Sequence, residues 1–142
     1  MHHCIISLAA NCNQEENLAE ARCRLGKILF SPSYTEAIWT EPFVSKKGNH
    51  SSPLDLQLLA TEGTQDLSPH TNLYLNQLVY AETELGVGEL EAELKAIELS
   101  MGRTTKDRHL GIVRIDLDLL QYDSTRYHLR DWERPYIRQL LR

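Results

Sequence analysis

The chain has 142 residues, the length of one ordinary domain, because a second hydrophobic core would leave each half only marginally stable. Hydrophobic residues make up 42% and charged residues 25%, which is typical of a globular chain and excludes a disordered one; no apolar run approaches the roughly 20 residues of a transmembrane helix. The formal net charge of −5 disfavours nucleic acid as a partner.

Positive charge is concentrated near the C-terminus. Residues 1–102 carry 6 Lys and Arg against 14 Asp and Glu, whereas residues 103–142 carry 9 against 6. A local cationic patch on an acidic protein suits a small polyanion, although a solvated basic tail is an equally good interpretation of the charge alone.

The three cysteines, Cys4, Cys12 and Cys23, lack close paired spacing, which argues against a disulfide framework and against a structural zinc site. The N-terminus leads into a strand-like segment without a Lys/Arg leader. We therefore expect a cytoplasmic protein, and its oligomeric state stays open.

The first part of the chain predicts a strand, a helix and a second strand. Residues 3–9 are short and apolar, as in a buried strand. Asn13, followed three residues later by a glutamate, is typical of a helix N-cap, and a stripe reaching Leu29 predicts about four helical turns. Pro32 is expected to stop this helix, and residues 34–40 resume as a β-prone segment.

The rest of the chain begins with clusters of Gly, Ser, Asn and Pro that predict a long loop over residues 44–72. Residues 73–83 alternate like a third strand, and residues 88–102 place apolar side chains on one face of a second helix. After a basic connector, residues 113–122 predict a fourth strand, and residues 134–142 predict a short terminal helix with a proline near its start.

The order βαββαβ, followed by the terminal helix, favours a ferredoxin-like α+β sandwich. In such a fold both long helices pack on one face of a mainly antiparallel sheet. The chain is then a single domain, with residues 44–72 as a long loop insertion.

The most informative stretch is Arg114-Ile115-Asp116-Leu117-Asp118. In a strand alternate side chains point to the same side, so Asp116 and Asp118 share a face while apolar residues occupy the other. The two residues lie about 7 Å apart along the strand, and their charges repel each other unless a cation lies between them. Because magnesium takes carboxylate and phosphate oxygens, the pattern indicates a magnesium site. An ordinary half-exposed strand is the alternative.

This stretch, with Glu98 and Gly102-Arg103 before it, is similar to the signature of the 6-hydroxymethyl-7,8-dihydropterin pyrophosphokinase family, in which two Asp flanking a Leu bind magnesium. Earlier matches extend the resemblance over nearly the whole chain. Asn11 matches the last residue of the family's Gly-Ser-Asn turn. The segment Thr40-Glu41-Pro42-Phe43 resembles the family's Thr-Pro-Pro-Leu segment, and Tyr74-Leu75-Asn76 matches its Tyr-Leu-Asn. The chain is identified by resemblance as a divergent, C-terminally short member.

The resemblance implies an enzyme of folate biosynthesis that uses ATP and two magnesium ions, with a dihydropterin bearing a hydroxymethyl group as acceptor. The hydroxyl attacks the β-phosphorus of ATP, so that a diphosphate is transferred and AMP leaves. The protein contributes mainly positioning and charge neutralisation. In this assignment Asp116 and Asp118 hold the metal, and together with Arg103 and Arg114 they form the catalytic set.

The same resemblance assigns residues to the two substrates. Polar side chains and backbone groups are expected to hydrogen-bond to the pterin, which stacks between the rings of two tyrosines. The implied pterin-binding set is Asn11, Thr40, Pro42, Phe43, Tyr74, Asn76 and Tyr136. The nucleotide is bound by a carboxylate, an imidazole and guanidinium groups, which implies the set Glu98, Arg103, His128, Arg134 and Arg138.

Simpler interpretations of several residues stay open. Tyr74 also suits the core face of a strand, Glu98 suits a solvated helix face, and His128 suits a hairpin strand. Asn76 lies in an apolar strand and should find a hydrogen-bond partner if it is buried. Arginines at every fourth position from 130 to 142 would align as a cationic stripe in one terminal helix.

Four positions around the connector depart from the family pattern: Lys95 stands for a Gln, Thr105 for an Arg, Leu110 for a Trp and Val113 for an Arg. Two function classes therefore stay open, an active pyrophosphokinase and a non-catalytic module that keeps the pterin or nucleotide pocket without turnover. A ferredoxin-like regulatory or assembly domain is a third, and it predicts no magnesium-dependent ATP binding.

Overall fold

The computed structural model describes residues 1–42, 73–102 and 104–141. Phe43, Arg103 and the long loop predicted at 44–72 lie outside the described residues. The elements in chain order are β1 (His2–Ala10), α1 (Gln14–Leu25), β2 (Phe30–Tyr34), β3 (Ile38–Thr40), β4 (Tyr74–Thr83), α3 (Val87–Ser100), α4 (Thr105–His109), β5 (Asp116–Tyr122), β6 (Thr125–Arg126), the 3₁₀ turn η2 (Asp131–Glu133) and α5 (Pro135–Leu140).

The strands form one six-stranded sheet with β1 at its centre, and every pairing between described strands is antiparallel. β4 and β5 flank β1, and β2 and β3 both pair with the outer side of β4. β6 pairs only with the end of β5. The order β2-β4-β1-β5-β6, with α1 and α3 as the two crossovers, confirms the predicted ferredoxin-like α+β fold.

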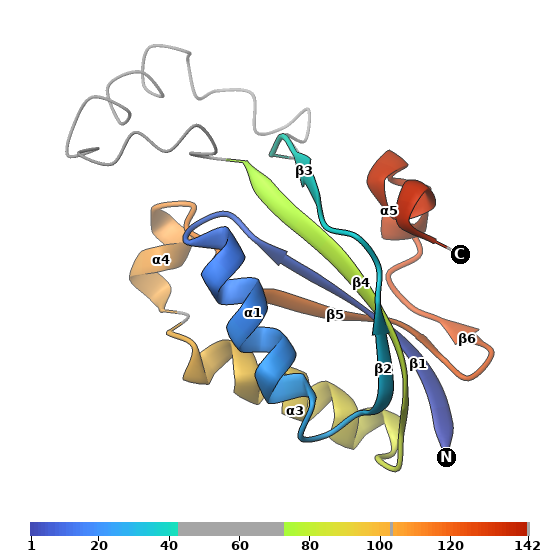
Figure 1. The fold of residues 1–142 in the computed structure, drawn as a ribbon. Helices are drawn as coiled ribbons and strands as arrows, with labels where there is room; N and C mark the ends of the chain where they lie inside the picture. Colours follow the sequence, from blue (N-terminus) through green and yellow to red (C-terminus); the bar gives the residue numbers. More distant parts are fainter. Residues whose placement is uncertain (43–72, 103, 142) are drawn as a thin grey trace.

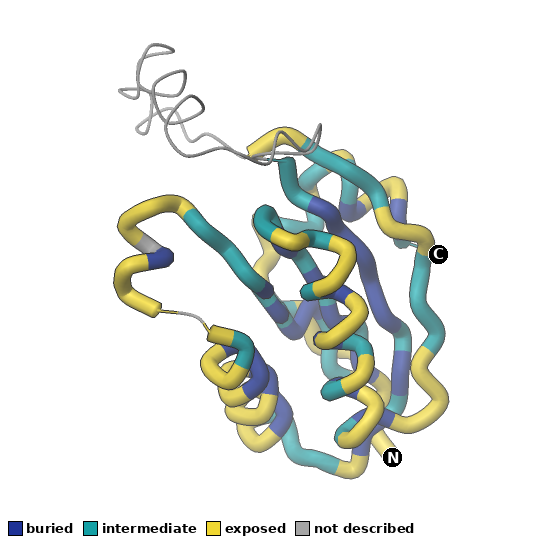
Figure 2. Tube along the Cα trace, turned by 60° about the vertical axis from the view of Figure 1, so that its left-hand side comes forward, coloured by how far each residue is buried: buried dark blue, intermediate teal, exposed yellow. Residues whose placement is uncertain are grey.

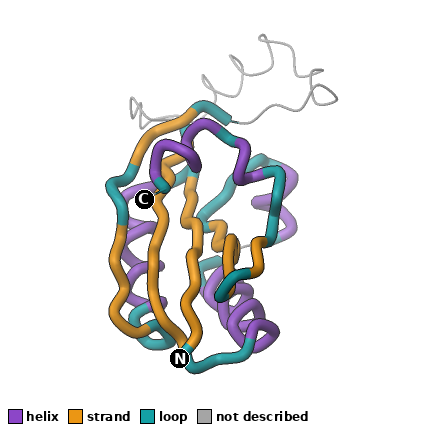
Figure 3. The backbone as a smooth tube through the Cα atoms, turned by 90° about the vertical axis from the view of Figure 1, so that its right-hand side faces the viewer, coloured by secondary structure: helices purple, strands orange, loops and turns teal. Residues whose placement is uncertain are grey.

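Two layers cover the two faces of the sheet (Figures 1 and 3). α1 and α3 bury the main core, and Figure 2 shows the buried positions gathered in the central strands and on the sheet-facing side of α3. α5 lies on the opposite face, where Leu78 and Leu120 of the sheet pack against Ile137 and Leu140. Among the described helices, none is both long and apolar enough to cross a membrane.

The first helix is shorter than predicted. α1 has 12 residues, and Leu29 of the predicted stripe is buried beyond its end. Asn13 is the N-cap of α1, as predicted, but its backbone has a left-handed φ of 41° and its side chain makes no capping hydrogen bond. A capping side chain needs extended backbone to reach the first free N–H groups. The turn before α1 is instead stabilised by a side chain of the helix, because Asn17 Nδ2 donates to the Cys12 carbonyl oxygen at 2.8 Å.

The predicted strand over residues 34–40 is divided into β2, which starts earlier, and β3. Pro32 does not stop α1, which has already ended, but lies inside β2 at the edge of the sheet. The register of β2 shifts between Phe30 and Ser33. Proline has no N–H for a β ladder, so it is tolerated at such an edge or bulge.

The predicted strand over residues 113–122 begins only at Asp116, and the sequence did not predict α4 before it. The strand begins where its partner β1 turns away, because Ala9 pairs with Asp116 and the α1 turn follows two residues later. Arg114 therefore lies in a bend, outside the alternation of β5.

The terminal helix covers only Pro135–Leu140 of the predicted 134–142. Arg134 before it has extended backbone, with φ −69° and ψ 137°, as expected for a residue that precedes a proline. The predicted arginine stripe is wrong for the described residues, since Arg138 lies in α5 but Arg130 and Arg134 lie outside it. Arg142 lies beyond the described ranges.

Candidate active site

The predicted alternation along β5 is confirmed. Ile115, Leu117 and Leu119 are 1%, 5% and 2% exposed and belong to the core under α1 and α3. Asp116 and Asp118 are half-buried on the other face, the one that α5 partly covers. Their cross-strand neighbours on β1 are the small residues Ala9 and Ser7, so space remains above the two carboxylates.

A small cavity of about 140 Å³ opens on this face beside the two aspartates. It brings together side chains from five separate parts of the chain. Its walls include Ser7, Ala9, Thr40, Tyr74, Asn76, Asp116, Asp118, Arg134 and Tyr136. The structure thus places Thr40, Tyr74, Asn76 and Tyr136 of the predicted pterin set around one cavity.

Asn76 is 3% exposed and has the partners that a buried amide requires. Its Nδ2 donates to Thr40 Oγ1 at 2.8 Å and to the Ile38 carbonyl oxygen at 3.2 Å. Within the described part of the chain no hydrogen bond reaches its Oδ1. The side chain is therefore held in place by its donors, while its acceptor oxygen is available to the cavity.

Two tyrosine rings stand in the wall of the small cavity near the aspartates. Burial raises the pKa of Tyr74, and the negative charge of Asp116 raises this pKa further. Burial also raises the pKa of Tyr136, while a hydrogen bond with Arg134 acts in the opposite direction. Both hydroxyls consequently stay protonated at neutral pH, and both rings are uncharged surfaces for stacking. Tyr74 thus lines a cavity, which argues against a purely core role.

A larger cavity of about 790 Å³ lies on the other side of the same aspartates. α3 provides one wall, and Thr104 and Thr105 at the start of α4 provide a second. β5 and the loop after β6 complete the lining. Its polar lining consists of Glu91, Lys95, Glu98, Thr104, Thr105, Asp116, Asp118 and His128. Cavities of 300–1,000 Å³ are typical of sites for small molecules and cofactors.

Glu98 is 6% exposed, so the interpretation as a solvated helix face is wrong. Its Oε2 accepts a 2.7 Å hydrogen bond from the backbone N–H of Leu117, which lies between the two aspartates. β6 pairs only with Gln121 and Tyr122, so no described strand covers this stretch of the β5 edge. Glu98 satisfies the backbone there and holds the strand at the point where the aspartates project.

His128 lies after β6 and outside it, so the interpretation as a hairpin-strand residue is wrong. Its backbone has a φ of 53°, in the left-handed region that is uncommon for a residue with a side chain. Strained backbone of this kind is concentrated at functional sites. The position of His128 in the wall of the larger cavity is compatible with the predicted phosphate role, which stays a prediction.

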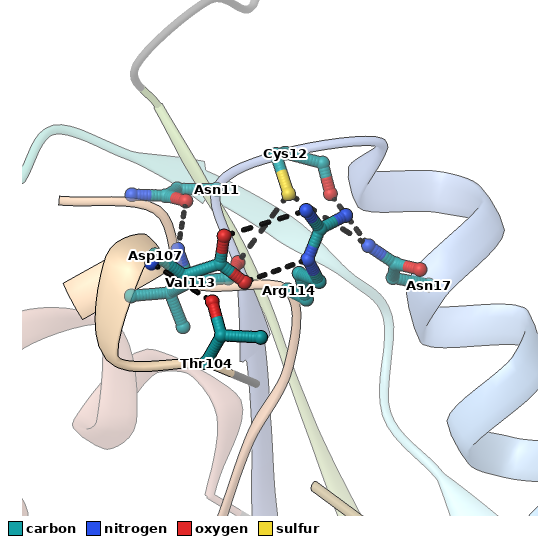
Figure 4. Close-up of polar contacts among 7 residues, drawn as sticks. All are labelled: Asn11, Cys12, Asn17, Thr104, Asp107, Val113 and Arg114. Carbon is teal, nitrogen blue, oxygen red and sulfur yellow. Dashed lines mark hydrogen bonds and ion pairs between the residues drawn. The ribbon is translucent and has the colours of Figure 1, made fainter. Parts of the chain in front are cut away.

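Arg114 is directed away from both cavities, and Figure 4 shows it between Asp107 and the turn before α1. Its Nε donates to Asp107 Oδ2 at 2.8 Å, and this hydrogen bond holds the pKa of Asp107 below its ordinary value. Asp107 is only 6% exposed. The predicted role of Arg114 in catalysis requires this ion pair to open, and that role stays a prediction.

Asn11 belongs to the same network (Figure 4). Its Oδ1 accepts a hydrogen bond from the backbone N–H of Val113 at 2.6 Å, and its Nδ2 donates to the Gly111 carbonyl oxygen at 2.8 Å. Asn11 thus joins the end of β1 to the connector after α4. Burial raises the pKa of Tyr74 and Asn11 lowers it, so this network adjoins the small cavity.

The remaining predicted residues lie farther out. Pro42 lines a groove of about 860 Å³ between β3 and α5, which shares Thr40, Arg134 and Tyr136 with the small cavity. Arg134 Nε pairs with Asp131 Oδ1 at 3.1 Å. Arg138 is exposed and lines none of these three cavities. The structure thus does not bring Arg138 to the aspartates.

The donor set suits magnesium that arrives with a polyphosphate. Among the residues that the structure describes, no group of three or more His, Cys, Asp or Glu side chains forms a metal site. Mg²⁺ usually takes one or two carboxylates and completes its octahedron with phosphate oxygens and water. Asp116 and Asp118 fit that requirement, whereas a structural zinc ion would need four protein ligands.

A model of the 7,8-dihydro-6-hydroxymethylpterin-pyrophosphokinase family matches residues 5–142. The chain belongs to this family. A relative from pea (Pisum sativum), named folate synthesis bifunctional protein, mitochondrial, is 44% identical to the chain over 72 residues. That match covers 45% of the chain and 14% of the pea protein. The name places the pea protein in the mitochondrion, and the cytoplasmic location expected for this chain stays a prediction.

Several residues of the candidate site were not predicted from the sequence. Glu91 and Thr104 line the larger cavity, as does Lys95, which the sequence marked only as a departure from the family. A signal was present, because Glu91, Lys95 and Glu98 recur at helical spacing beside the apolar face of α3. That spacing alone does not distinguish a cavity wall from solvent.

Proposed function

We propose that the chain transfers diphosphate from ATP to the hydroxymethyl group of 6-hydroxymethyl-7,8-dihydropterin and releases AMP. One observation carries the proposal: Asp116 and Asp118 stand in the walls of both the small cavity and the larger one. A metal held by these carboxylates would contact a phosphate chain on one side and the acceptor on the other. Family membership supports the same assignment.

In this proposal the pterin occupies the small cavity between the rings of Tyr74 and Tyr136, because flat heterocycles stack on aromatic faces. Asn76 offers its Oδ1 to the N–H groups of the pterin edge, and the backbone around Thr40 and Pro42 contributes further polar groups. Family resemblance adds Asn11 and Phe43 to the pterin set, and Phe43 follows Pro42 in the sequence. The small cavity would gain room for the pterin if it opened toward the adjoining groove between β3 and α5.

The nucleotide occupies the larger cavity in this proposal, with His128 near its phosphates and Arg134 at the border of the small cavity. Family resemblance assigns Arg103, which precedes Thr104 in the sequence, to the phosphates as well. The acceptor hydroxyl attacks the β-phosphorus and gives up its proton, the bond from that phosphorus to the α–β bridging oxygen breaks, and AMP leaves. Magnesium, when bound, neutralises charge on the phosphate oxygens. Asp116 and Asp118 orient the phosphate chain, and the two cavities hold the reactants in line.

The direct test is to incubate the protein with Mg-ATP and 6-hydroxymethyl-7,8-dihydropterin and to measure AMP and the pterin diphosphate. We expect AMP only when both substrates are present. Asp116→Asn and Asp118→Asn should each lower the rate by about a hundredfold or more, as for the loss of a group that stabilises transition-state charge. Glu93→Gln on the exposed side of α3 is the matched control and should leave the rate unchanged.

A second candidate function is a non-catalytic module that binds the pterin and the nucleotide. The observation in its favour is that Arg114 pairs with Asp107 and lines neither cavity, while Val113 is apolar. Calorimetry distinguishes the candidates. Binding of both ligands without AMP formation would establish the module, and absence of Mg-ATP binding would leave only a regulatory or assembly domain.

A further inference from the structure

The larger cavity has a strongly acidic lining. Glu91, Glu98, Asp116 and Asp118 all stand in its wall, and of the described residues that line it, Lys95 is the one lysine or arginine. A polyphosphate cannot enter such a cavity without cations on its oxygens. Magnesium at the aspartates supplies some of this charge, and Lys95 is placed to supply more.

Among the described residues, none is a partner that would hold Lys95 away from a ligand. Lys95 is exposed, and no hydrogen bond or ion pair joins it to another residue in the ranges the structure describes. Its helical neighbour Glu98 is turned to the Leu117 N–H. A flexible lysine stem with a compact ammonium head suits a phosphate contact that forms only when the ligand arrives.

On the side of α4, the described residues that line the cavity carry no positive charge. Thr104 and Thr105 line it there with hydroxyl groups. Arg114, which follows the connector, is engaged by Asp107 and lies outside the cavity wall. Among the described residues that line the cavity, the permanent positive charge therefore comes from Lys95 of α3.

We propose that Lys95 of α3 is a phosphate-binding residue of the nucleotide cavity, which contacts the terminal phosphates of ATP beside Asp116 and Asp118. The proposal rests on the proposed nucleotide site and deepens it. The ammonium group adds to the charge neutralisation that magnesium at the aspartates provides. Its effect on binding should increase with the number of phosphates near the aspartates, because the contact is ionic.

The test is calorimetry of the full chain with Mg-ATP and with AMP, on the unchanged protein and on Lys95→Gln, Lys95→Arg and Lys27→Gln. Lys27 is exposed after α1 and lines none of the described cavities, so it controls for the same loss of charge. We expect Lys95→Gln to weaken Mg-ATP binding about tenfold, as for the loss of a charge-assisted hydrogen bond, and to change AMP binding by less than about twofold. Lys95→Arg should restore most of the loss.

A thermal melt without ligand separates binding from folding. All three variants should melt with the unchanged protein, because exposed side chains without partners contribute little to stability. Equal Mg-ATP affinity of Lys95→Gln and the unchanged protein would overturn the role of Lys95 and leave the proposed function intact. An equal loss in Lys27→Gln, or an equal loss for AMP, would also overturn it. If the unchanged protein fails to bind Mg-ATP, both proposals fail.

Discussion

Glu98 determines how the backbone is held between the two aspartates. Removing its carboxylate leaves the Leu117 N–H without an acceptor in a buried position, which costs about 1–3 kcal/mol. We expect Glu98→Ala to lower the free energy of unfolding by about this amount. Glu98→Gln keeps an acceptor oxygen and should lose less. Urea unfolding of the two variants is the measurement, and equal stability of Glu98→Ala and the unchanged protein would contradict the assignment.

The ion pair of Asp107 and Arg114 predicts a pH dependence of stability. The hydrogen bond from Arg114 lowers the pKa of Asp107 from its ordinary 3.8, although burial opposes this shift. A lowered pKa in the folded state contributes stability above the unfolded value, and that contribution is lost as the pH falls through the folded value. Asp107→Asn should therefore be less stable than the unchanged protein at neutral pH.

The difference in unfolding free energy between Asp107→Asn and the unchanged protein should narrow as the pH falls below about 3.8. Urea titrations at a series of pH values measure this difference. If this difference in unfolding free energy stays constant from neutral to acid pH, the charge of Asp107 is not what stabilises the folded protein.

At the scale of elements, α5 is a six-residue helix whose attachment depends on packing. Such a short helix is unstable alone, so Ile137, which is 1% exposed against Leu78 and Leu120, holds it to the sheet. We expect Ile137→Ala to lower the unfolding free energy by about 2–5 kcal/mol. Pterin binding should weaken as well, because α5 carries Tyr136 into the small cavity.

The exposed neighbour Gln139 provides the matched control for the helix. Gln139→Ala should leave the free energy of unfolding nearly unchanged, since it removes no buried contact. Calorimetric titration of pterin and urea unfolding measure the two effects. If Ile137→Ala is destabilised but binds pterin with unchanged affinity, the packing of α5 does not contribute to the pterin site.

For the whole molecule, magnesium and nucleotide should stabilise the fold only together. Because the described residues offer two carboxylates and no three-residue metal cluster, Mg²⁺ alone should shift the melting temperature little. Mg-ATP at about 100 times its dissociation constant should stabilise the fold by about 2.7 kcal/mol. Asp116→Asn and Asp118→Asn should fold but lose this gain. A full melting shift with Mg²⁺ alone, or an unchanged Mg-ATP shift in both variants, would refute the metal assignment.

Much of the fold could be predicted from local pattern. The apolar stripes of α1 and α3 and the alternation of β4 and β5 follow directly from helical and strand periods, and they predict the sheet with two helices on one face. The residues at which helices and strands begin and end were harder to predict. α1 stops at Leu25, before the end of its predicted stripe. β5 starts at Asp116 because its partner strand β1 turns away there, and Pro32 is tolerated because β2 lies at an edge.

The sequence by itself determined that Asp116 and Asp118 share one face and that the residues between and beside them are buried, because the two-residue period of a strand is a local property. Only the tertiary structure decided what surrounds the aspartates. Tyr74, Tyr136, Lys95 and His128 reach them from distant parts of the chain, and the choice of partners, such as Glu98 for the Leu117 N–H and Asp107 for Arg114, depends on which elements pack together.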